Sequence, residues 1–87
     1  MVFLVIDPAS VPEAMASAKQ LGCAIWVGSD GVTEDEYQRY GASGIKISRF
    51  IYQLANADEL VLSDARETIG EHHPSEIIWI QYLWTPK

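Results

Sequence analysis

The sequence lacks the residues on which several classes of protein depend. It has a single cysteine, Cys23, which has no partner for an internal disulfide and fits a reducing cytoplasm. It contains no H-x-x-H or C-x-x-C pattern, and the adjacent His72 and His73 are poorly spaced to chelate a metal. Gly41 and Gly44 are not followed by the Lys-Ser/Thr of a phosphate-binding loop. We therefore expect no metal, no cofactor and no enzymatic activity.

Long apolar runs are also missing. The most apolar stretch, Glu76–Trp84, is far shorter than the roughly 20 residues that a membrane-spanning helix needs. The apolar segment Met1–Ile6 has no basic residues before it and is followed at once by Asp7, so it does not resemble a secretory signal. These features predict a cytoplasmic protein.

Positive charge is scarce. Six Lys and Arg residues stand against twelve Asp and Glu residues, which gives a net charge of −6. Such a protein repels nucleic acid and anionic lipid and attracts basic proteins. With 87 residues, 48% of them hydrophobic, the chain is expected to form a single globular domain over residues 1–87.

Four short segments have the apolar, β-branched composition of strands, namely Val2–Ile6, Cys23–Val27, Glu59–Ser63 and Glu76–Trp84. The last is apolar on both alternating faces, which predicts a central strand covered by helices on both sides. Its direction, parallel or antiparallel, stays open. Glu59–Ser63 also fits a helix capped by Asn56, although the compact Leu60-Val61-Leu62 favours a strand.

Helical patterns separate these segments. A helix is expected from Ser10 or Val11 to a stop at Gly22, and a short one over Glu34–Tyr40 after a Thr33 cap. A longer helix is expected over Ile45–Ala55, and a short one from Asp64 to about Glu71. The order βα-βαα-βα-β predicts an α/β domain with a three- to four-stranded, mostly parallel sheet and about four helices.

Carboxylates recur where the predicted strands end. Asp7, Asp30 and Asp64 follow three of them, and the carboxyl ends of parallel strands share the edge at which open α/β sheets bind ligands. Asp after a strand is also ordinary turn and capping chemistry. The acidic turn that begins the Glu34–Tyr40 helix should crowd toward the same edge. The predicted partner-binding residues are Asp7, Asp30, Glu34, Asp35, Glu36, Tyr37, Tyr40 and Asp64.

Tyr37 and Tyr40 have two interpretations. Their spacing of three puts both rings on one face of the predicted helix. Aromatic rings beside charge are typical of interface anchors, but the same rings could pack onto the core.

In length, acidity and α/β character the chain resembles the small acidic bacterial immunity proteins that inhibit nuclease toxins, of the barstar-like or contact-dependent-inhibition type. The resemblance implies a cognate basic toxin as partner and a carboxylate surface that stands in for substrate phosphates. The implied mechanism is stoichiometric occlusion of the toxin's active site. The free protein would be a monomer or a weak dimer, with no membrane or direct nucleic-acid partner.

Two other functions compete with this one. A small Mg²⁺-binding α/β domain or enzyme would use Asp7, Asp30 and Asp64 around the ion. An oligomeric structural subunit would bury Tyr82 and Trp84 between copies.

Overall fold

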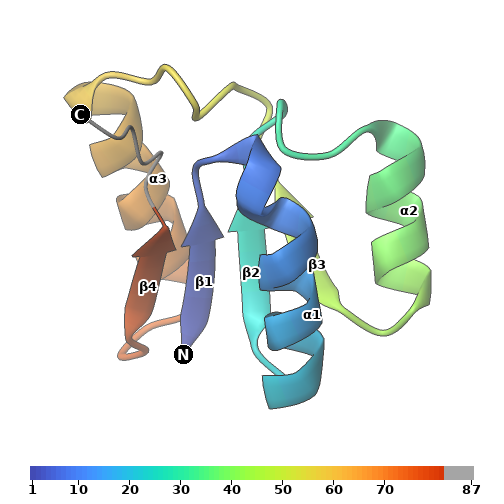
Figure 1. The fold of residues 1–87 in the computed structure, drawn as a ribbon. Helices are drawn as coiled ribbons and strands as arrows, with labels where there is room; N and C mark the ends of the chain where they lie inside the picture. Colours follow the sequence, from blue (N-terminus) through green and yellow to red (C-terminus); the bar gives the residue numbers. More distant parts are fainter. Residues whose placement is uncertain (82–87) are drawn as a thin grey trace, which may run out of the picture.

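A parallel four-stranded sheet organises the protein. The structure, a computed structural model, describes residues 1–81. The strand order is β3-β2-β1-β4, and every neighbouring pair is parallel (Figure 1). The elements are β1 (Val2–Val5), the 3-10 turn η1 (Pro8–Ser10), α1 (Val11–Leu21), β2 (Ala24–Val27), α2 (Glu34–Ala42), β3 (Lys46–Arg49), α3 (Glu59–His72) and β4 (Ile78–Gln81). The predicted α/β class is confirmed, with three α-helices within residues 1–81 instead of about four.

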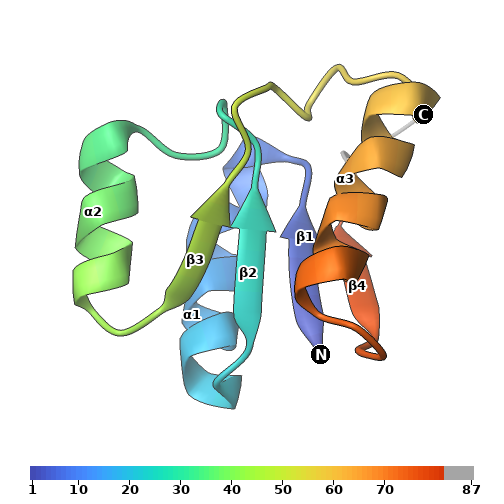
Figure 2. The same ribbon diagram turned by 180° about the vertical axis from the view of Figure 1, so that it is seen from behind.

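Helices cover both faces of the sheet. Helices α1 and α2 lie on one face and α3 lies on the other (Figures 1 and 2). The strands alternate accordingly: Val5 and Ile25 are buried with Met15 of α1, whereas Leu4 and Trp26 are buried with Ile69 of α3. Two apolar clusters, one on each face, therefore share the same strands, as expected for a sheet buried on both sides.

The predicted central strand is an edge strand. β4 pairs only with β1 among the described strands, in parallel, which settles its direction. Ile78 and Ile80 pack on the α3 side, but Ile77 and Trp79 are 72% and 61% exposed. An apolar pattern on both faces shows that a strand is apolar. It does not show whether another strand pairs with each of its two edges. The rest of the predicted strand, Tyr82–Trp84, lies outside the described residues.

The helix predicted over Ile45–Ala55 is wrong. Lys46–Arg49 forms strand β3, and an irregular segment follows it. Ile45 and Ile47 pack on the α1–α2 side of the sheet, while Phe50 and Leu54 are buried on the α3 side. A strand followed by a loop can thus produce the same apolar spacing as a helix, and the β-branched isoleucines favour the strand.

The strand predicted over Glu59–Ser63 is also wrong, because this segment is the start of α3. The open alternative, a helix, is correct in type, but the cap is Asp58 and not Asn56: the Asp58 carboxylate accepts a hydrogen bond from Val61 N at 3.0 Å. The helix continues to His72, so Asp64 lies within it and does not begin a new one.

The N-terminal half follows the predictions closely. Helix α1 ends at Gly22, whose φ of 71° is the left-handed conformation that glycine tolerates best. Helix α2 is capped by Thr33, whose hydroxyl accepts from Glu36 N while the Glu36 carboxylate accepts from Thr33 N at 2.8 Å. This capping box fixes the start of α2 at Glu34. No helix within residues 1–81 is long and apolar enough to span a membrane.

Candidate protein-binding surface at the carboxyl end of the sheet

One end of the sheet collects most of the acidic residues. All four strands point toward this end and the helices run back from it, so the N-termini of α1, α2 and α3 lie there too (Figure 1). We call it the acidic end. Arg49 is the only Lys or Arg located there within residues 1–81. Its acidic residues are Asp7, Glu13, Asp30, Glu34, Asp35, Glu36, Asp58 and Glu59.

Asp30 is partly buried and organises the loop between β3 and α3. Its two carboxylate oxygens accept hydrogen bonds from Leu54 N and Ala55 N, both at 3.2 Å. Gly28 makes this approach possible, because a Cβ there would lie 2.6 Å from Asp30 Oδ1 and 2.9 Å from Leu54 N. Asp30 therefore satisfies two backbone donors within the protein, and these hydrogen bonds fix the orientation of its carboxylate.

Several other carboxylates are engaged in helix and turn geometry. Asp7 accepts from Ala9 N at 3.0 Å and from the Ser10 hydroxyl at 3.4 Å, and so caps the η1 turn. Glu36 and Asp58 cap α2 and α3 as described above. These negative charges remain at the acidic end, where the helix dipoles stabilise them, but each side chain is held by a backbone N–H.

Glu34 is the carboxylate of the acidic end that forms an ion pair within residues 1–81. It lies 3.5 Å from the Arg49 guanidinium and accepts a hydrogen bond from Gln38 at 3.0 Å. Arg49 also donates to the Ser29 carbonyl at 2.9 Å, which ties the end of β3 to the end of β2. The Glu34 carboxylate is itself largely exposed, so this ion pair contributes little to stability.

Three carboxylates at this end remain uncommitted. Glu13, Asp35 and Glu59 lie in the first turns of α1, α2 and α3, and all three are exposed. No hydrogen bond or ion pair joins their side chains to any of residues 1–81. They are the carboxylates that a partner could reach without displacing an internal contact.

Asp64 does not join the other predicted residues. It lies in the second turn of α3 and accepts a hydrogen bond from the Tyr52 hydroxyl at 3.3 Å. Burial, followed by the negative charge and hydrogen bond of Asp64, raises the pKa of Tyr52. The trio Asp7, Asp30 and Asp64 therefore does not converge on an ion, and the described residues contain no group of three His, Cys, Asp or Glu side chains placed to hold a metal.

Tyr37 and Tyr40 lie on the inner face of α2. Both rings are half-buried against the apolar cluster on the α1–α2 side. Tyr37 also lines a shallow hollow of about 450 Å³ at the acidic end. The lining residues of this hollow are Ser29, Glu34, Tyr37, Arg49, Phe50 and Ile51.

Sequence reasoning missed two exposed apolar residues at the acidic end. Ile51, just after β3, is 95% exposed, and Leu60, in the first turn of α3, is 81% exposed. Both were expected inside secondary structure that buries them, so no sequence signal marked them as surface residues. Single exposed apolar side chains are common on protein surfaces, and these two are notable only because they lie at the same end as the exposed carboxylates.

The opposite end of the sheet, where the chain passes from α3 to β4, holds a set of connected hydrogen bonds around Glu76. The Trp26 indole N–H donates to His73 Nε2 at 3.2 Å, and His73 Nδ1 lies 3.2 Å from a Glu76 oxygen. The other Glu76 oxygen accepts from the Met1 ammonium at 2.8 Å. That hydrogen bond is the main cause of the lowered pKa of Glu76.

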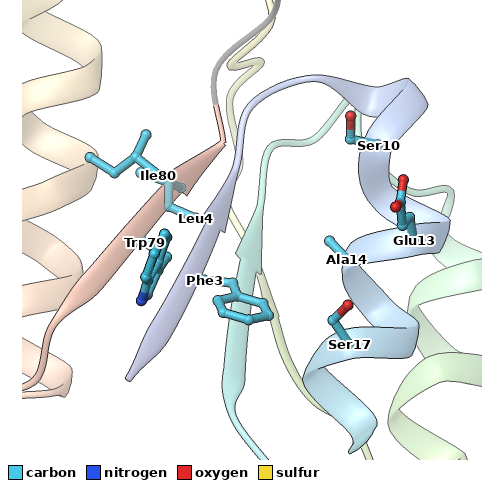
Figure 3. A pocket seen from close by; sticks show the side chains of 8 residues that line it. All are labelled: Phe3, Leu4, Ser10, Glu13, Ala14, Ser17, Trp79 and Ile80. Atoms are coloured by element: carbon cyan, nitrogen blue, oxygen red, sulfur yellow. The ribbon is translucent and has the colours of Figure 1, made fainter. Parts of the chain in front are cut away.

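A groove of about 380 Å³ runs between α1 and β4 (Figure 3). Glu13, Ala14 and Ser17 of α1, with Ser10 just before the helix, form one wall at spacings of three and four residues. Phe3, Leu4, Trp79 and Ile80 of β1 and β4 complete its lining. The groove exists because α1 sits nearer β2 than β4 and no other helix within residues 1–81 covers β4 on this face (Figure 1).

Comparison of the chain with protein-family models, curated proteins and solved structures finds no match. The arrangement of the side chains is therefore the basis for assigning a function.

Proposed function

We propose that this protein is a stoichiometric inhibitor that captures a basic partner protein through its acidic end, in the manner of an immunity protein that neutralises a nuclease toxin. The observation that carries the proposal is the charge distribution. Eight of the twelve acidic residues are at the acidic end, where Arg49 is the only Lys or Arg within residues 1–81. Lys19, Arg39 and Lys46 lie toward the other end.

Helix capping explains part of this asymmetry but not all of it. Capping accounts for Asp7, Glu36 and Asp58, and internal hydrogen bonds account for Asp30. Glu13, Asp35 and Glu59 make no such bond to the rest of residues 1–81 and face solvent. Their mutual repulsion, and that of their capped neighbours, is relieved when a cationic surface approaches.

The apolar residues supply what charge alone does not. Ile51 and Leu60 can each bury a large side chain against a partner, and the hollow beside Ile51 can receive one in return. Exposed carboxylates around such anchors form the polar rim that is typical of tight interfaces. We therefore include Ile51 and Leu60 among the partner-binding residues, along with Glu13, Asp35 and Glu59.

The inhibitory mechanism follows from what a nuclease cleft binds. Such a cleft is lined with Lys and Arg side chains that hold phosphate groups. Carboxylates presented by a rigid α/β domain can occupy the same cationic positions but offer no bond to cleave. Long-range attraction accelerates encounter, and the buried apolar contacts slow dissociation.

The experiment uses the intact chain as bait in a lysate of its own host, with captured proteins identified by mass spectrometry and assayed for nuclease activity. The expected result is one basic nuclease that loses its activity at a one-to-one ratio. Capture of a nuclease whose activity persists in the complex would contradict inhibition, and capture of acidic proteins only would contradict the electrostatic basis.

A matched pair of variants then locates the surface. Asp35→Asn with Glu59→Gln removes two charges from the acidic end, and Glu67→Gln with Glu71→Gln removes two from the later turns of α3. All four side chains are exposed. The first pair should weaken capture of the nuclease and the second should leave it unchanged. Equal effects would show that net charge, and not the acidic end, governs binding.

A further inference from the structure

The two edges of the sheet differ in how they are protected. The β3 edge begins with Lys46 and ends with Arg49, and α2 packs beside it through Tyr37 and Tyr40. Charged residues and neighbouring elements are common devices against unwanted strand pairing. The β4 edge, Ile78–Gln81, contains no charge and no proline, and Ile77 just before it is mostly exposed.

The outer backbone groups of β4 can be assigned from its register. Val2 aligns with Ile78, and Val2 N donates to Ile77 O at 2.9 Å. In a parallel ladder the N–H and C=O of alternate residues turn toward the same neighbour. The backbone groups of Ile77 and Trp79 therefore turn toward β1, whereas those of Ile78 and Ile80 turn outward. No other strand within residues 1–81 pairs with them.

From these features we propose that β4 pairs with β4 of a second copy of this chain, in antiparallel fashion about a two-fold axis at Trp79. This register sets Ile78 opposite Ile80 of the second copy, so the outward N–H and C=O groups of both residues exchange hydrogen bonds in both copies. The two sheets become one continuous eight-stranded sheet.

Side chains support the same register. Trp79 would face Trp79 of the second copy at a non-hydrogen-bonded position, where opposed side chains approach most closely. In the single chain this indole is 61% exposed beside Phe3, on the face opposite α3 (Figure 3). Pairing would cover it with another aromatic ring, a favourable cross-strand combination.

Charge repulsion between two copies is smallest in this antiparallel orientation. The protein carries a net charge of −6, which opposes self-association when like charges meet. Antiparallel pairing points the two acidic ends in opposite directions, so the most negative surfaces are kept apart. Both acidic ends also stay free, so a dimer can hold two partners at once.

The first test is sedimentation velocity of the full chain between about 1 µM and 1 mM, a range that covers weak to moderate affinities. The mass should rise from 9.7 kDa toward twice that value as concentration increases. Trp79→Lys, which places a charge at the edge, should keep the chain monomeric over the whole range. Ile51→Lys removes an exposed apolar side chain far from β4 and should dimerise like the unmodified chain.

The second test is hydrogen exchange of single amides by NMR, which does not depend on any variant. The Ile78 and Ile80 amides should become protected as concentration rises, while the Trp79 amide, turned toward β1, should be protected at every concentration. A monomer at 1 mM, protection of Ile78 and Ile80 that does not change with concentration, or loss of dimer in Ile51→Lys would each overturn the proposal. Constant protection would show that the chain covers its own edge.

Discussion

The two ends of the sheet use carboxylates in opposite ways. At the far end, Glu76 sits in one connected network that joins β4, α3, Trp26 and the chain's first residue. At the acidic end, carboxylates have different roles: Asp30 accepts hydrogen bonds from two backbone N–H groups, while the Asp35 side chain makes no hydrogen bond or ion pair with any of residues 1–81. The role of a carboxylate is thus decided by the donors around it and not by its position after a strand or at a helix start.

The largest expected effect is on stability, and it should differ between two aspartates of the acidic end, Asp30 and Asp35. Asp30→Ala leaves the N–H groups of Leu54 and Ala55 without their acceptor, and should lower the free energy of unfolding by about 2–4 kcal/mol. Asp35→Ala loses only a favourable helix-dipole contact and should cost less than about 1 kcal/mol. Urea unfolding measures both. Similar losses in the two variants would mean that Asp30 and Asp35 do not differ as described.

The next largest effect on stability is expected at the opposite end of the sheet, at His73. His73→Ala removes the acceptor of the nearly buried Trp26 indole N–H, and should lower the free energy of unfolding by about 1–2 kcal/mol. The Trp26 indole N–H resonance should move toward the position of an unbonded indole. His72→Ala is the control, because the His72 ring only packs near Trp26, with centroids 5.4 Å apart. An unshifted resonance in His73→Ala would contradict the hydrogen bond.

The smallest effect is a dependence on pH. The hydrogen bond from the Met1 ammonium lowers the pKa of Glu76, which favours the ionised form in the folded state. Stability from this group is therefore present above its ordinary pKa and is lost as pH falls through the lowered one. Glu76→Gln should be less stable than the unmodified chain at neutral pH, and the difference should shrink on acidification. A difference that grows as pH falls would contradict the direction of the shift.

Local signals made the first half of the chain predictable. Thr33 with Glu36, and Gly22 in its left-handed conformation, fix helix ends by backbone hydrogen bonds that depend on adjacent residues alone. The second half depends on which strand lies beside which. The spacing of Ile47, Phe50 and Leu54 fits a helix equally well, and only the sheet makes it a strand followed by a loop.

The residues of the acidic end, like the fold, could be predicted only where local sequence signals determine their positions. The Glu34–Glu36 turn is where the Thr33 cap puts it, and Asp7 and Asp30 follow strands that exist. The predicted position of Asp64 after a strand is wrong because Glu59–Ser63 is the start of α3 and not a strand. Ile51 and Leu60 could not be identified, because exposure of an apolar residue is a property of the folded surface and has no local pattern.

The most direct measurement is the association rate constant of this protein with the captured nuclease, followed by stopped-flow fluorescence at increasing salt. Asp35→Asn with Glu59→Gln should slow association by about three- to tenfold at low salt, and the difference should fade as salt screens the charges. Glu67→Gln with Glu71→Gln should match the unmodified chain. Equal rates for both double variants, insensitive to salt, would contradict capture through the acidic end.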